Sequence, residues 1–125
     1  MGYLIVFLGG GLGAMLRHGM NLLGARLLPD GGFPLTTLTV NITGSIVMGI
    51  LAAIFAFKGG GPQHWRLFLT TGILGGYTTF SSFSLDAAVL YERGDFRSTV
   101  VYVLASVALS IAGLFLGLML ARSVL

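Results

Sequence analysis

Hydrogen-bonding side chains recur at helical spacing inside three otherwise apolar stretches of this sequence. Residues three, four, seven or eight apart share one face of a helix, so each stretch predicts a polar stripe. Hydroxyl and amide groups can replace the hydration shell of a small anion without binding it too tightly for release. The stripes comprise Thr37, Asn41, Gly44, Ser45 and Met48; Thr79, Ser81, Ser82 and Ser84; and Tyr102, Ser106 and Ser110.

A single stripe of this kind also serves as ordinary interhelical hydrogen bonding, and that interpretation stays open for each Ser or Thr alone. Three stripes together favour a continuous polar path. Acidic residues are absent from the middle of every stretch: Asp86 falls near the end of one, and Glu92 and Asp95 fall in a connection. Because proton-coupled transporters usually need an embedded carboxylate, the pattern favours passive conduction.

Two aromatic residues and one cation accompany the stripes. Phe80 and Phe83, at i and i+3, point the same way and could offer their positive ring edges to an anion, or could be plain core residues. Arg17 lies midway along the first apolar stretch, where it must either snorkel or face a water-filled vestibule that would concentrate anions.

Composition assigns these residues to a membrane protein. Of 125 residues, 55% are hydrophobic and 9% charged, and the mean hydropathy is +0.94. A soluble domain of this size cannot cover so much apolar surface. The seven Lys/Arg are scattered singly, which argues against nucleic acid as a partner, and there is no cysteine for disulfide or thiolate chemistry.

Four apolar stretches, each long enough to cross about 30 Å of hydrocarbon, predict a single all-α transmembrane domain over residues 1–125. The connections between them are short and turn-like, so the helices should pack as an up-and-down bundle. The predicted helices span about 3–28, 34–57, 66–91 and 98–121.

The third stretch should contain a broken helix. Between Gly72 and Thr79 it places three glycines and two β-branched threonines, which all disfavour helix. Unwound backbone at membrane depth persists only where it lines a cavity, an ion or a protein contact. A simple kink is the alternative.

Three motifs in the right order resemble the Fluc (CrcB-type) fluoride channel family across essentially the whole chain. Residues 9–17 (GGGLGAMLR) are similar to the family's GGxxGAxxR, and residues 37–44 (TLTVNITG) to its TLxVNxxG. Residues 72–84 (GILGGYTTFSSFS) match GxxGGxTTFSTFS almost throughout. The sequence differs from the family's common residues at Thr36, His18, Asp86 and Ser82. These differences bear on the vestibule and the conduction rate more than on ion selectivity.

The resemblance implies a passive, fluoride-selective channel that exports fluoride across the plasma membrane, which would be the inner membrane of a bacterium. It implies an antiparallel, dual-topology homodimer with two pores and, on the dimer axis, a structural Na⁺ held by main-chain oxygens of Gly75 and Thr78. Hard cations favour such oxygen ligands. By the same likeness the pore residues are Asn41, Thr79, Phe80, Ser81, Phe83, Ser84, Tyr102, Ser106 and Ser110, with Arg17 in the vestibule.

Two other classes of membrane protein fit parts of the pattern. A small multidrug-type proton antiporter should carry a glutamate in its first helix, where this sequence has Arg17. A non-transporting assembly subunit predicts irregularly placed polar residues instead of three stripes. An enzyme is not expected, because two histidines and four carboxylates assemble no nucleophile–base pair or metal cluster.

Charge counting predicts that the chain inserts in both orientations. Orientation follows the Lys/Arg bias between short loops, and the two sides carry three basic residues each: Lys58, Arg66 and Arg122 against Arg26, Arg93 and Arg97. C-terminal reporter fusions should therefore be active on both sides of the membrane, and lysines added at one end should select one orientation. Activity on one side alone would require parallel subunits.

Overall fold

The computed structural model describes residues 1–28, 32–57, 59 and 61–125, and every regular element within them is helical. The predicted all-α class is therefore confirmed. Parts of the predicted connections, residues 29–31, 58 and 60, lie outside the described residues, and Lys58 of the charge count is among them. The elements are α1 (Gly2–Leu27), α2 (Leu35–Phe57), α3 (Gln63–Arg66), the π-helix η1 (Leu67–Leu74), α4 (Gly75–Tyr77), α5 (Phe80–Glu92) and α6 (Phe96–Val124).

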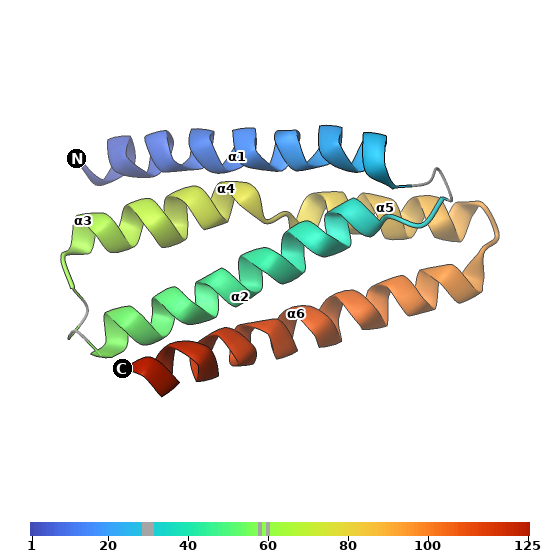
Figure 1. Ribbon diagram of the computed structural model, residues 1–125. Coiled ribbons are helices and arrows are strands. Elements are labelled where there is room, and N and C mark those ends of the chain that lie inside the picture. The colour runs from blue at the N-terminus through green and yellow to red at the C-terminus, as the bar shows by residue number, and fades with distance from the viewer. Residues whose placement is uncertain (29–31, 58, 60) are drawn as a thin grey trace.

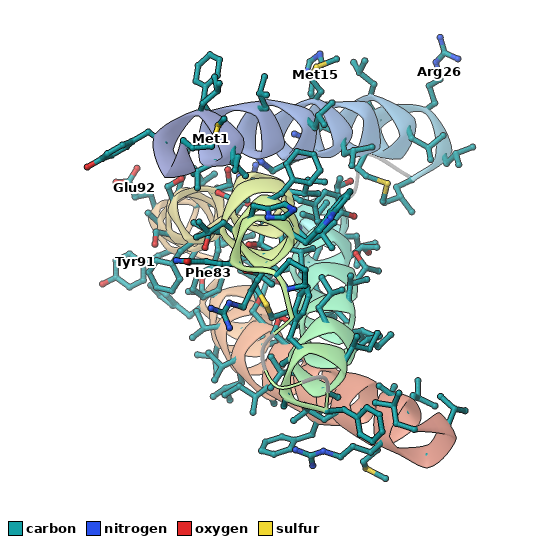
Figure 2. The ribbon with its side chains drawn as sticks, turned by 90° about the vertical axis from the view of Figure 1, so that its left-hand side faces the viewer. Met1, Met15, Arg26, Phe83, Tyr91 and Glu92 are labelled. Atoms are coloured by element: carbon teal, nitrogen blue, oxygen red, sulfur yellow. The ribbon has the colours of Figure 1, made fainter. Side chains whose placement is uncertain are left out.

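The chain runs back and forth along one direction (Figure 1). The N-terminus, the C-terminus and the start of α3 lie at one end, and α5 turns into α6 at the other. The most extensive packing joins α2 to α6, and α1 lies along η1 and α4. Figure 2 shows Met15 and Arg26 on the outer side of α1, pointing away from the other helices.

Two helices in the described part of the chain are long and apolar enough to cross a membrane by length and composition. They are α2, with 23 residues, and α6, with 29 residues. The mean hydropathy over an 18-residue window is 2.1 in α2 and 2.4 in α6. Large apolar side chains point outward on several helices, among them Phe7 on α1, Leu85 on α5 and Phe115 on α6. Such extensive exposed apolar surface belongs against lipid or another protein.

An acidic cap sets the start of α6 two residues before the predicted residue 98. Asp95 Oδ1 accepts a hydrogen bond of 3.2 Å from the Ser98 amide, as an N-cap side chain does. The hydrogen bonds from Ser98 lower the pKa of Asp95, which lies in the exposed connection. A lowered carboxyl pKa stabilises the folded state above the unfolded pKa, and this contribution is lost as the pH falls through the folded pKa.

Glycines permit backbone-to-backbone contact at both main helix interfaces. A Cβ on Gly13 of α1 would overlap the carbonyl oxygen of Ile73 in η1, and one on Gly117 of α6 would overlap that of Ile46 in α2. Small residues allow this approach where lipid supplies no hydrophobic drive between helices. In contrast, a Cβ on Gly11 would meet nothing within 4 Å.

Gly13→Ala should destabilise the fold, whereas Gly11→Ala on the same helix should not. The first methyl group forces α1 away from η1, at a cost of about 1–3 kcal/mol typical of overpacking. The second adds helix propensity, a gain of about 0.5–1 kcal/mol. Unfolding by sodium dodecyl sulfate in mixed micelles measures both variants. Equal midpoints would show that the contact between α1 and η1 is less close than described.

Candidate ion pathway beside the helix break

Two extended residues separate α4 from α5. Thr78 has φ −80° and ψ 155°, and Thr79 has φ −149° and ψ 118°. Both residues are β-branched, a class that favours extended backbone over helix. The interruption falls at the end of the Gly72–Thr79 segment whose composition disfavours helix.

A π-helix, which the residue types did not predict, precedes the interruption. In η1 the hydrogen bonds run from i to i+5, a pattern that often occurs at functional sites. Gly72 of η1 lies against Gly9 of α1, and a Cβ on Gly72 would stand 2.9 Å from the Gly9 Cα. Both segments are rich in glycine, but no residue type signals i to i+5 bonding, so the π-helix has no recognisable sequence pattern.

Asn41 of α2 pairs with both polar backbone groups of Thr79. Its Nδ2 donates to the Thr79 carbonyl oxygen at 3.0 Å, and its Oδ1 accepts from the Thr79 amide at 2.8 Å. The side-chain amide thus acts as a hydrogen-bond partner for a residue that has left the helix. This contact satisfies backbone groups that would otherwise be costly to bury.

The interruption takes the helical donors from the carbonyl oxygens of residues 75–78, among them those of Gly75 and Thr78. In a continuous helix the Thr79 amide would bond the Gly75 carbonyl, and the Ser82 amide would bond the Thr78 carbonyl. Instead, the Thr79 amide bonds Asn41, and the Ser82 amide donates to the Thr79 hydroxyl at 3.1 Å. The carbonyl oxygens of Gly75 and Thr78 therefore belong to the set that the interruption releases, and the Gly76 oxygen in the same set accepts from Arg17 instead.

Arg17 of α1 lies on the other side of the same segment. It is half-buried, and its Nε donates to the carbonyl oxygen of Gly76 at 3.1 Å. The sequence left open whether Arg17 snorkels or faces a vestibule, and the structure shows that part of its guanidinium is bound to backbone.

A cavity of about 380 Å³ opens between α2, the break and α6. It gathers six of the predicted pore residues, together with Thr78, from segments far apart in the sequence. Between the polar groups, its wall is apolar. The lining comprises Asn41, Gly44, Ser45, Met48, Leu74, Thr78, Thr79, Phe80, Phe83, Ser106, Val107, Ser110, Ile111 and Leu114.

The predicted stripe on the last helix is divided in the structure. Ser106 is buried, and its hydroxyl has no hydrogen-bond partner among the described residues. Ser110 lines the cavity beside it. Tyr102 is fully buried outside the lining, and its hydroxyl donates to Asp86 Oδ2 at 3.1 Å. The ring centroids of Tyr102 and Phe83 are 5.3 Å apart, so Tyr102 backs the cavity wall.

The other predicted residues lie outside this cavity. Ser81 shares a hydrogen bond of 3.2 Å with the Thr79 hydroxyl, and Ser84 is exposed. Gly75 lines a second cleft of about 640 Å³ between α2 and η1, where Arg66 also lies. Phe80 and Phe83 do line the cavity, with ring centroids 5.3 Å apart, although Phe80 is 77% exposed in the single chain.

The polar stripes did not predict the apolar residues of the cavity lining or one further polar contact. Val107, Ile111 and Leu114 follow a spacing of four and three on α6, and the first two lie one position beyond the predicted serines. That spacing was a usable signal, but it resembles any core stripe. Tyr77, beside the break, shares a hydrogen bond of 3.0 Å with the Thr43 hydroxyl of α2. This pairing has no local sequence signature.

Comparison with known proteins identifies the family. Residues 4–118 match the family described as CrcB-like protein, Camphor Resistance (CrcB). The chain is 64% identical over 123 residues, 98% of each chain, to the "Fluoride-specific ion channel FluC" of Rhodopseudomonas palustris (strain ATCC BAA-98 / CGA009). It is 63% identical over 124 residues, 99% of each chain, to the protein of that name in R. palustris (strain BisB5). A further relative, "Fluoride-specific ion channel FluC 2" of Nitrobacter hamburgensis, is 53% identical over 122 residues, 98% of each chain. The chain therefore belongs to the CrcB family.

Proposed function

We propose that this membrane protein is a passive, fluoride-selective ion channel. Full-length relatives bearing that name support the proposal. The observation that carries it is a cavity lined in part by Ser106, whose buried hydroxyl has no partner among the described residues. A buried donor of this kind is costly unless something accepts its hydrogen bond. A small anion in the cavity would accept it.

The chemistry of the cavity suits an anion that must pass through without being trapped. Hydroxyl groups of Thr79, Ser106 and Ser110 supply donors of moderate strength, and Phe80 and Phe83 supply ring edges. None of the described lining residues carries a carboxylate. A proton-coupled antiporter would need such a group, so passive flow is favoured. Fluoride can then exchange water for hydroxyl donors and move on, because no full charge holds it.

The membrane arrangement that we propose has more spans than the two helices that are long and apolar enough to cross a membrane. Four spans, formed by α1, α2, the run from α3 to α5, and α6, would cross the plasma membrane, with the third span broken at 78–79. Two chains would pair antiparallel as a dual-topology homodimer that lets fluoride leave the cytoplasm. Equal numbers of basic residues on the two sides support both orientations. Exposed apolar side chains support contacts with lipid and with a second chain.

We also propose Na⁺ as a structural ion, held by the main-chain oxygens of Gly75 and Thr78. These residues fit a hard cation, because both carbonyls have lost their helical donors to Asn41 and to the Thr79 hydroxyl. Two chains meeting there would supply four such oxygens. When bound, the ion would neutralise the negative ends of these carbonyls. An unfolding temperature that is equal in Na⁺ and in N-methyl-D-glucamine would remove the ion from the proposal.

Liposomes loaded with sodium fluoride or sodium chloride test the function directly. With purified protein and no proton gradient, fluoride efflux measured by an ion-selective electrode should exceed chloride efflux by orders of magnitude. An imposed proton gradient should not be required, since the cavity lining lacks a titratable carboxylate among its described residues. Equal fluoride and chloride rates, or flux only with a proton gradient, would contradict the proposal.

Ser106→Ala should lower fluoride efflux by about tenfold, because one donor hydrogen bond to the ion is lost. The unfolding midpoint should be unchanged or higher, since the deleted hydroxyl has no partner within the described chain. Ser123→Ala is the matched control on α6, where the hydroxyl donates to the Leu120 carbonyl and lies far from the cavity lining. Equal efflux from both variants would mean that the Ser106 hydroxyl takes no part in conduction.

A further inference from the structure

We infer that Asn41 is a positioning residue, whose side-chain amide fixes the helix break by pairing with both polar groups of Thr79. The consequence for conduction rests on the proposed function, but the pairing itself does not. The pore residues expected from the sequence include Asn41 as an amide facing the ion. In the structure its oxygen and one of its Nδ2 hydrogens are engaged by backbone.

The geometry of the pair is that of two amides joined by reciprocal hydrogen bonds. Both distances, 2.8 Å and 3.0 Å, fall in the usual range for N–H···O bonds. One bond needs an acceptor on the side chain, and the other needs a donor on the same group. Asn at this position supplies both, whereas a hydroxyl or a carboxylate at the same reach supplies only part of the pattern.

Further contacts from α2 show that the pairing holds a defined segment. The Thr43 hydroxyl bonds the Tyr77 hydroxyl two residues before Thr79. At Gly44 a Cβ would overlap the Thr78 side chain. Helix α2 thus contacts residues 77–79 through the Thr43 hydroxyl, Gly44 and the Asn41 amide.

The position of Thr79 determines where α5 begins and whether the Gly75 carbonyl has a helical donor. Its hydroxyl caps α5 by accepting from the Ser82 amide, and α5 begins at the next residue, Phe80. Its amide, held by Asn41, cannot return to the Gly75 carbonyl. Asn41 therefore sets where the aromatic pair of the cavity starts and keeps the Gly75 carbonyl without its helical donor.

Hydrogen exchange at the Thr79 amide tests the pairing without any ion flux. In nanodiscs, Asn41→Leu should exchange this amide about tenfold faster than wild type or more, because its buried acceptor is gone. Thr39→Val is the matched control, since Thr39 is an exposed residue of α2 outside the cavity lining. It should exchange as wild type does. Equal protection of Thr79 in all three proteins would overturn the inference.

Asn41→Asp gives a second test with a pH signature, and it applies even if the leucine variant does not fold. The ionised carboxylate can accept from the Thr79 amide but opposes the Thr79 carbonyl, whereas the protonated acid regains a donor and mimics the amide. The exchange rate relative to wild type should therefore be high at pH 7.5 and fall toward one as the pH is lowered.

The comparison is made against wild type at each pH, so Arg17, Asp86 and intrinsic exchange contribute equally to both proteins. A ratio that does not change with pH overturns the inference, because the donor to Thr79 would then be dispensable. Fluoride efflux at pH 7.5 should fall in both Asn41 variants. If wild type conducts no fluoride, the proposed function fails, while the exchange ratios still decide the role of Asn41.

Discussion

A peptide group removed from water must keep a hydrogen-bond partner, and the rest of this structure follows from how residues 75–82 meet that requirement. Leaving a helix inside an apolar medium exposes amides and carbonyls at a cost of about 2–7 kcal/mol each if nothing replaces their partners. Here Asn41 takes both groups of Thr79, the Thr79 hydroxyl takes the Ser82 amide, and Arg17 takes the Gly76 carbonyl. The interruption is stabilised because three helices contribute to it.

Those contacts depend on helices that approach one another closely. Arg17 reaches the Gly76 carbonyl because α1 meets this segment through Gly13 and through Gly76, whose added Cβ would overlap the Gly10 carbonyl. On the other side, Gly44 leaves room for Thr78 against α2. The glycines lower helix propensity, but the close approach at Gly13 and Gly76 accompanies the hydrogen bond from Arg17 to the Gly76 carbonyl. Close helix packing and the hydrogen bonding of the released backbone groups therefore depend on each other.

The sequence was informative where residue type determines the outcome and silent where tertiary contact does. The all-α class and the family were predicted correctly, since apolar stretches and the 72–84 motif depend on local composition. Glycines and β-branched threonines marked the segment that holds Thr78 and Thr79, but nothing local specified the π-helix before it. The role of Asn41 toward Thr79 was missed, because 38 residues separate the pair and an asparagine on a polar stripe suggests an ion ligand equally well. Of the six predicted pore residues in the lining, four lie on the polar stripes, and Phe80 and Phe83 were assigned to the pore by family likeness. Ser84 and Tyr102 show that a stripe does not specify which of its members line a cavity.

The placement of Tyr102 explains how a carboxylate can lie near this cavity without repelling an anion from it. Asp86 is absent from the described lining, and its Oδ2 accepts a hydrogen bond from Tyr102. The ring of Tyr102 packs on Phe83, whose own ring is part of the cavity wall. The Asp86 carboxylate is thus paired with the Tyr102 hydroxyl and separated from the cavity by the contact between two aromatic rings. Ser106 lies one turn further along α6, and its hydroxyl has no hydrogen-bond partner among the described groups. An anion in the cavity meets neutral donors first, which gives attraction without a fixed opposite charge that would hold it in place.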